Sequence, residues 1–203
     1  YFLKELELIS QLPWWRLLLP LNEFGGRWGP TGFLLVHWLE SRVGEPNAFY
    51  VLTASMVGIG YLVTFGVFRS LLLATLVGFA LATTTFNYHV YSVSGSVITL
   101  PLVCFLFLFG FAQFKWLSLQ ERSLWWAAAV AISGVLLALS YEGWLDIVPF
   151  VWVITPLLVW YFLRLRDSDR AMRAGSAAAY VTALAVAYTV IKIRFGLNGL
   201  HPK

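Results

Sequence analysis

Six long apolar stretches dominate this sequence and leave the chain few ways to fold. They cover residues 47–68, 70–86, 97–114, 124–141, 145–163 and 176–195. Each is close to the roughly 17–25 residues that an α-helix needs to cross a lipid bilayer. Charged residues make up only 12% of the 203-residue chain, about half the share found in an average soluble domain. The sequence therefore predicts an all-α fold, a polytopic transmembrane bundle of about six spanning helices.

Two segments near the start of the chain mix apolar and charged residues. Residues 1–19 combine leucines and tryptophans with charged side chains and contain Pro13, which stops or kinks a helix. Residues 31–43 are too short to span a bilayer and carry a histidine and charged side chains. We expect both to be amphipathic helices in the membrane interface. Ten tryptophans fit a protein with aromatic belts at the two membrane surfaces.

Positive charge is distributed unevenly among the predicted connections. The linker 164–174 holds four arginines, the loop 115–123 holds one lysine and one arginine, and the tight turn before the second span holds Arg69. Six alternating spans place all three connections on one side. The opposing connections, 87–96 and 142–144, contain no lysine or arginine. Because cytoplasmic loops are enriched in these residues, the first side is predicted to be cytoplasmic.

This topology places both ends of the chain on the outer side. We expect a single membrane domain over residues 1–203, with an outer-face region at 1–46, spans within 47–195 and an outer tail at 196–203. The chain begins with Tyr1 rather than methionine, which suggests a piece of a longer protein. The single cysteine, Cys104, lies in an apolar stretch and has no partner for an internal disulfide.

A polar, aromatic cluster falls on the predicted outer side, in the uncharged stretch 83–96. Its side chains offer hydrogen bonds and flat faces, which suit sugar hydroxyls better than a nucleic acid. The candidate substrate-contacting residues here are Asn87, Tyr88, His89 and Tyr91. The same stretch also fits a plain loop whose serines cap the next helix, and a lone histidine is more often structural than catalytic.

Charged residues on the same side form the other candidates. Glu142 and Asp146 are four residues apart, so on an α-helix both carboxylates would share a face. They fit either an acidic pair at a cavity mouth or two solvated acids in a loop. Arg27, in a glycine-rich turn, is suited to a lipid phosphate or to interfacial anchoring. Lys192 and Arg194 end the last span against the positive-inside trend, which indicates a lipid headgroup or a lipid-linked phosphate there.

The order of these parts also carries a family resemblance. An outer amphipathic segment leads into "GGRWGPTGFLLVHWLESRVG" at 25–44, a ladder of short spans follows, and "LLALSYEGWLDIVPFVWV" stands at 136–153. This arrangement resembles the N-terminal part of the GT-C class of integral membrane glycosyltransferases. The class includes protein mannosyltransferases and aminoarabinose-type lipid transferases.

The resemblance implies transfer of a sugar from a polyprenyl-phosphate donor to an acceptor at the outer face of a bacterial inner membrane. It implies that the donor phosphate meets Arg27, with Lys192 or Arg194, and that the sugar lies against residues 87–91. The catalytic acid of the class would fall upstream of Tyr1, so no catalytic residue is assigned. No cofactor is predicted. Some members of the class use a divalent metal, but no residues here have ligand spacing strong enough to predict a site.

Two other functions compete with the transferase reading. A non-catalytic structural or accessory subunit of a larger membrane complex would need neither an acidic motif nor metal ligands. A transporter is favoured less, because transporters place charges at mid-membrane and this chain keeps its charges at the ends of the spans. The expected partners are the lipid bilayer, a polyprenyl-phosphate sugar and other membrane subunits, with no nucleic acid.

Overall fold

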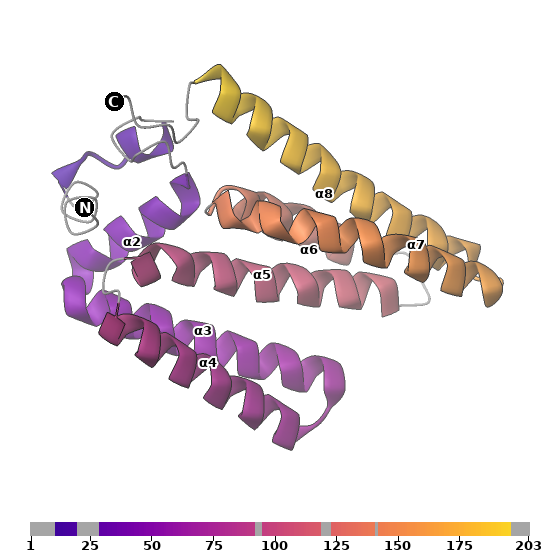
Figure 1. Ribbon diagram of the computed structural model, residues 1–203, viewed down its shortest axis with the longest axis horizontal. Helices are drawn as coiled ribbons and strands as arrows, with labels where there is room; N and C mark the ends of the chain where they lie inside the picture. Colours follow the sequence, from indigo (N-terminus) through magenta and orange to yellow (C-terminus); the bar gives the residue numbers. More distant parts are fainter. Residues whose placement is uncertain (1–10, 20–28, 92–94, 119–122, 141, 196–203) are drawn as a thin grey trace.

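The computed structural model describes most of the chain as helix (Figure 1). The described residues are 11–19, 29–91, 95–118, 123–140 and 142–195, and their side chains are placed except at 45–46, 85–91, 95–99 and 142–143. The elements are η1 (Arg16–Leu18), α2 (Pro30–Val43), α3 (Glu45–Phe68), α4 (Leu71–Tyr91), α5 (Gly95–Ser118), α6 (Leu124–Ala138), η3 (Glu142–Ile147), α7 (Val148–Arg164) and α8 (Ser168–Arg194). No β-strand occurs in these ranges, which confirms the all-α fold.

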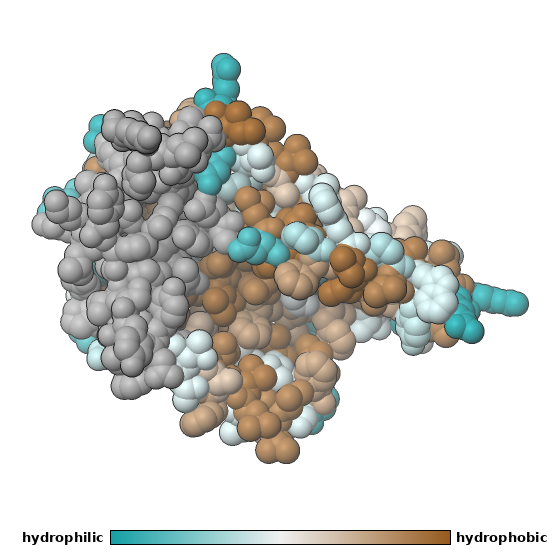
Figure 2. All heavy atoms as spheres, in the orientation of Figure 1, coloured by the Kyte–Doolittle hydropathy of each residue, from teal (hydrophilic) through white to brown (hydrophobic). Residues whose placement is uncertain are grey.

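The six predicted spans correspond one to one with α3 to α8. Within the described residues, four helices are long and apolar enough to cross a membrane, and they cover 47–68, 100–118, 144–164 and 168–194. The apolar parts of α4 and α6, Leu71–Thr84 and Leu124–Ala138, are shorter. The chain is therefore built as a helical membrane bundle. Figure 2 shows hydrophobic side chains spread over the outside of the helices in this view, as expected where lipid replaces water.

Helix α5 lies between the two halves of the bundle (Figure 1). Leu100 and Cys104, in its first half, join an apolar cluster with α2 and α3 that includes Phe33 and Met56. Its second half provides Phe109 to another apolar cluster, formed with α6, η3, α7 and α8. Each cluster thus draws on α5, and this helix connects them.

The two ends of the bundle differ in charge. Turns from α3 to α4, from α5 to α6 and from α7 to α8 lie at one end, which we call the cationic end (Figure 1). Its described charged residues give a net charge of +4, from two carboxylates and six cations: Asp167, Asp169, Arg69, Lys115, Arg164, Arg166, Arg170 and Arg173. The described acids and bases at the opposite end, which we call the α2 end, balance: Glu40, Glu45, Glu142, Asp146, Arg16, Arg42, Lys192 and Arg194.

Helix α2 closes the α2 end by docking onto the turn that follows α6. The backbone N–H of Thr31 donates a hydrogen bond to the carbonyl oxygen of Leu139 at 3.0 Å. Gly32 lies against the backbone carbonyl of Ser140 with no room for a side chain. One face of α2 is buried, with Phe33 and Val36 almost fully enclosed. The predicted helix at 31–43 is confirmed as α2, and one of its faces packs against the bundle.

The predicted outer loop at 87–96 is wrong for residues 87–91 and 95–96, and residues 92–94 lie outside the described part of the chain. Helix α4 continues through Tyr91 and α5 already begins at Gly95. The polar residues Asn87–Tyr91 therefore extend the apolar helix α4 rather than form a loop. Just before this extension, Thr83 satisfies its own hydroxyl within the helix, since its Oγ1 donates to the Phe79 carbonyl at 2.9 Å.

The predicted linker at 164–174 is also mostly helical. Helix α8 begins at Ser168, and Asp167 caps it by accepting a hydrogen bond from the Arg170 backbone N–H at 3.0 Å. Aspartate is a favoured residue at this capping position. One of the four arginines in this predicted linker, Arg173, lies in the second turn of α8 and is buried.

The first predicted interfacial helix falls largely on residues 1–10, outside the described part of the chain. Within the described remainder, Gln11 is helical and Arg16–Leu18 form a short 3-10 helix. Trp14 and Trp15 are exposed beside it, a placement typical of side chains at a membrane surface. Leu17 is fully buried against the cluster beneath α2.

Candidate functional site

The sequence-predicted site residues that the structure places all belong to the α2 end. Asn87, Tyr88, His89 and Tyr91 occupy the last two turns of α4, Glu142 opens η3, and Lys192 and Arg194 lie in the last turn of α8. Arg27 lies outside the described residues. The side chains at 87–91 and at Glu142 also lie outside the described part, so their contacts remain predictions.

These residues share an end but not a single pocket in the described structure. Figure 1 shows the ends of α4 and α8 well apart, with α5, α6 and α7 between them. Lys192 is partly buried and Arg194 is exposed. Residues two apart on an α-helix are about 200° apart around its axis, so the two side chains leave α8 in different directions. Both cations also complement the negative end of the helix dipole.

The 3-10 helix η3 changes the expected acidic pair. A 3-10 helix has about 3.0 residues per turn, which puts Glu142 and Asp146 about 120° apart instead of on one face. Asp146 is exposed. The buried member of η3 is Trp144, whose ring meets that of Tyr188 edge-on at a centroid distance of 6.1 Å and an angle of 87°. The 3-10 helix η3 thus packs the buried Trp144 ring against Tyr188 of α8.

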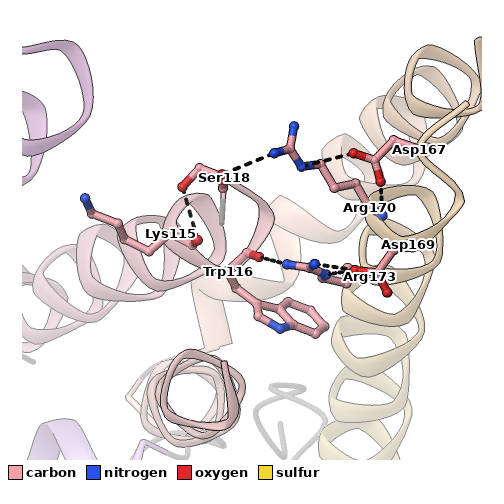
Figure 3. Close-up of polar contacts among 7 residues, drawn as sticks. All are labelled: Lys115, Trp116, Ser118, Asp167, Asp169, Arg170 and Arg173. Carbon is pink, nitrogen blue, oxygen red and sulfur yellow. Dashed lines mark hydrogen bonds and ion pairs between the residues drawn. The ribbon is translucent and has the colours of Figure 1, made fainter. Parts of the chain in front are cut away.

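A buried charged cluster, which the sequence analysis missed, lies at the cationic end (Figure 3). Arg173 is 4% exposed. Its Nε donates to Asp169 Oδ2 at 2.8 Å, its Nη2 contacts the same oxygen, and its Nη1 donates to the Trp116 carbonyl at 2.8 Å. Arg173 therefore links α8 to the last turn of α5, where carbonyl groups have no partner within their own helix.

A second arginine repeats this arrangement closer to solvent. Arg170 Nη2 donates to the Ser118 carbonyl at 3.4 Å, and its Nε lies 3.3 Å from Asp167 Oδ2 (Figure 3). Both arginines place positive charge at the C-terminal end of the α5 dipole. The sequence signal for the cluster was the pair Asp169–Arg173, four residues apart, which a helical reading of the linker would have placed on one face.

Among the residues that the structure describes, no group of three or more histidine, cysteine, aspartate or glutamate side chains is arranged to hold a metal ion. Figure 3 shows that the two aspartates of this cluster, Asp167 and Asp169, each contact an arginine. The contacts of this cluster tie the start of α8 to the end of α5.

Fold and charge distribution together define the class of protein as an all-helical, multi-pass membrane protein with one cationic end. No family model matches the chain, and no curated protein or solved structure matches it either.

Proposed function

We propose that the chain is part of a membrane glycosyltransferase that moves a sugar from a polyprenyl-phosphate donor to an acceptor, with its site at the α2 end. One observation carries the proposal, namely the separation of the two ends. The net positive charge collects at the cationic end, whereas the polar, aromatic end of α4, the packed helix α2 and the α8 cations lie at the other. This is the sidedness that an outward-facing, lipid-phosphate-dependent enzyme needs.

In this proposal the residues of the α2 end bind and orient substrate. Asn87, Tyr88, His89 and Tyr91 contact the sugar from the end of α4, and Glu142 accepts hydrogen bonds from sugar hydroxyls. Arg27 binds the donor phosphate, and Lys192 and Arg194 attract it to this end of α8. A general base, which the resemblance to the GT-C class implies, deprotonates the acceptor hydroxyl as it attacks the anomeric carbon, and the lipid phosphate leaves.

The proposed orientation has a direct test by cysteine labelling. In a Cys104→Ala background, single cysteines replace Asp146 and Ser168, both of which are exposed. Because η3 and the start of α8 lie at opposite ends of the bundle, we expect a membrane-impermeant maleimide to label position 146 in intact cells and position 168 only after permeabilisation. The proposal places the α2 end in the bacterial periplasm. Labelling of both positions in intact cells would contradict the topology.

The activity has its own test, in proteoliposomes that contain the full-length protein and labelled polyprenyl-phosphate sugars. We expect transfer, and we expect His89→Ala and Arg27→Ala each to lower it about tenfold, the effect of losing roughly 1.4 kcal/mol of binding. Ser168→Ala, at the cationic end, serves as the matched control and should leave transfer unchanged. Unchanged turnover in both site variants would reject these residue assignments, and absence of transfer from every donor would reject the enzyme.

A structural or accessory subunit remains the second candidate, and α7 favours it. Most of the large side chains of α7 are exposed, among them Phe150, Val153, Leu157 and Trp160. In a membrane this face contacts either lipid or the helices of another subunit. A stoichiometric membrane partner that co-purifies with the full-length protein, together with no transfer activity, would support this alternative.

A further inference from the structure

A pocket of about 230 Å³ opens at the cationic end between the first turns of α6 and α8. Its polar lining is Ser123, Asp169, Arg173 and Ser176, and its apolar lining is Trp116, Leu124, Ala127 and Met172. Pockets that enclose a whole small molecule span roughly 300–1,000 Å³. The volume is therefore suited to the headgroup of a larger ligand whose remainder lies outside.

We propose that this α6–α8 pocket binds the headgroup of a phospholipid that carries both a phosphate and a primary ammonium group, as phosphatidylethanolamine does. The pocket offers groups of both signs, one from Asp169 and one from Arg173, although it lies at an end whose net charge is positive. A headgroup with one positive and one negative group matches that pair.

The acceptor for the ammonium group is Asp169. Its side chain is 34% exposed, whereas that of its partner Arg173 is 5% exposed. Arg173 is held by Asp169 and the Trp116 carbonyl and is almost fully buried, so it fixes the carboxylate in position. A primary ammonium donates three hydrogen bonds. The Ser176 hydroxyl, which itself donates to the Met172 carbonyl at 2.8 Å, is a further acceptor in the pocket lining, two turns along α8 from Asp169.

The phosphate belongs on the α6 side of the pocket. Ser123 precedes α6, and its side chain makes no capping hydrogen bond to the helix. Its hydroxyl can therefore donate to a phosphate oxygen. The positive end of the α6 dipole and the buried Arg173 guanidinium both favour negative charge there.

The position of the pocket selects a lipid rather than a soluble ligand. Leu124 lines the pocket and is 86% exposed, and the neighbouring Trp125 is 87% exposed. Met172, on the α8 side, is exposed as well. Apolar side chains this exposed at the end of spanning helices are placed to meet acyl chains, with tryptophan at the headgroup level. This inference does not depend on the proposed enzymatic function, because the pocket lies at the other end of the bundle.

Native mass spectrometry of the full-length protein, titrated with phosphatidylethanolamine, phosphatidylcholine or phosphatidylglycerol, tests the proposal. We expect one phosphatidylethanolamine to be retained about tenfold more strongly than either other lipid, since only it supplies a hydrogen-bonding ammonium together with the phosphate. Asp169→Asn should remove this preference, whereas Asp167→Asn, one residue before α8 and outside the pocket, should keep it.

A second pair of variants leaves every charge in place. Ala127→Phe fills the pocket and should abolish the retained lipid, whereas Ala128→Phe, on the exposed neighbouring position, should not. These two variants test whether the lipid occupies the pocket even if Asp169→Asn weakens folding. Equal retention of the three lipids, or wild-type binding by Ala127→Phe, would overturn the proposal.

Discussion

Replacing Arg173 with alanine is expected to destabilise the bundle by about 2–4 kcal/mol. The substitution leaves the Trp116 carbonyl without its 2.8 Å donor and removes the buried partner of Asp169. Loss of one member of a fully buried pair costs roughly 3–5 kcal/mol, and we expect somewhat less because Asp169 stays in reach of water. Equilibrium unfolding of the full-length protein in mixed micelles measures the change.

Arg170→Ala is the matched control for this prediction. Arg170 belongs to the same helix and also reaches a carbonyl at the end of α5, but at 3.4 Å and with its side chain 26% exposed. Exposed ion pairs contribute roughly 0–1 kcal/mol, so its loss should cost less than about 1 kcal/mol. Equal costs for the two variants would show that the buried link between α8 and α5 does not stabilise the fold.

Gly32→Ala should detach or displace α2. A Cβ at this position would overlap the backbone carbonyl oxygen of Ser140, and backbone cannot rotate away as a side chain does. The helix must then move, which strains the Thr31–Leu139 hydrogen bond and opens the cluster around Phe33. Overpacking of this kind costs roughly 1–3 kcal/mol. We expect a lower unfolding temperature and faster proteolysis near α2.

Gly58→Ala provides the matched glycine control. In α3 a Cβ at position 58 would meet nothing within 4 Å. Alanine there should be neutral or should stabilise the helix by roughly 0.5–1 kcal/mol, because it reduces the freedom of the unfolded chain. If Gly32→Ala and Gly58→Ala have the same stability, the close approach of α2 to the turn after α6 is not important for the fold.

Apolar length predicted the positions of the six apolar helices well, because a helix in lipid must satisfy its own backbone. Four of them are long enough in their described residues to span a membrane. The ends of the helices were harder to predict. Polarity suggested a loop at 87–96, yet α4 continues to Tyr91. The charged residues after α7 suggested a linker, yet Asp167 caps a helix that begins one residue later. At the start of α8 a side-chain cap sets the boundary, and hydropathy does not report such a cap.

The candidate site followed the sequence less closely. The unequal distribution of charge between the two ends was predictable, because it follows from counting the charges between the apolar stretches. The described charges are distributed in this way. Which of the candidate residues at one end lie close together was not predictable, because that depends on how the helices are arranged around α5. Lys192 and Asn87 share an end but lie on α8 and α4, which stand apart with other helices between them (Figure 1). Arg173 was missed because its burial depends on α5, which is more than 50 residues away in sequence: the bond to Trp116 spans 57 residues.

The position of α5 has a consequence for how the bundle comes apart. Since one helix supplies side chains to both apolar clusters, neither half can loosen without exposing part of the other. Unfolding should therefore occur as one cooperative transition across α2, α3 and α5 to α8 rather than in two stages. A substitution at Phe109 of α5 should therefore lower the stability of both apolar clusters, including the one that Phe109 does not contact.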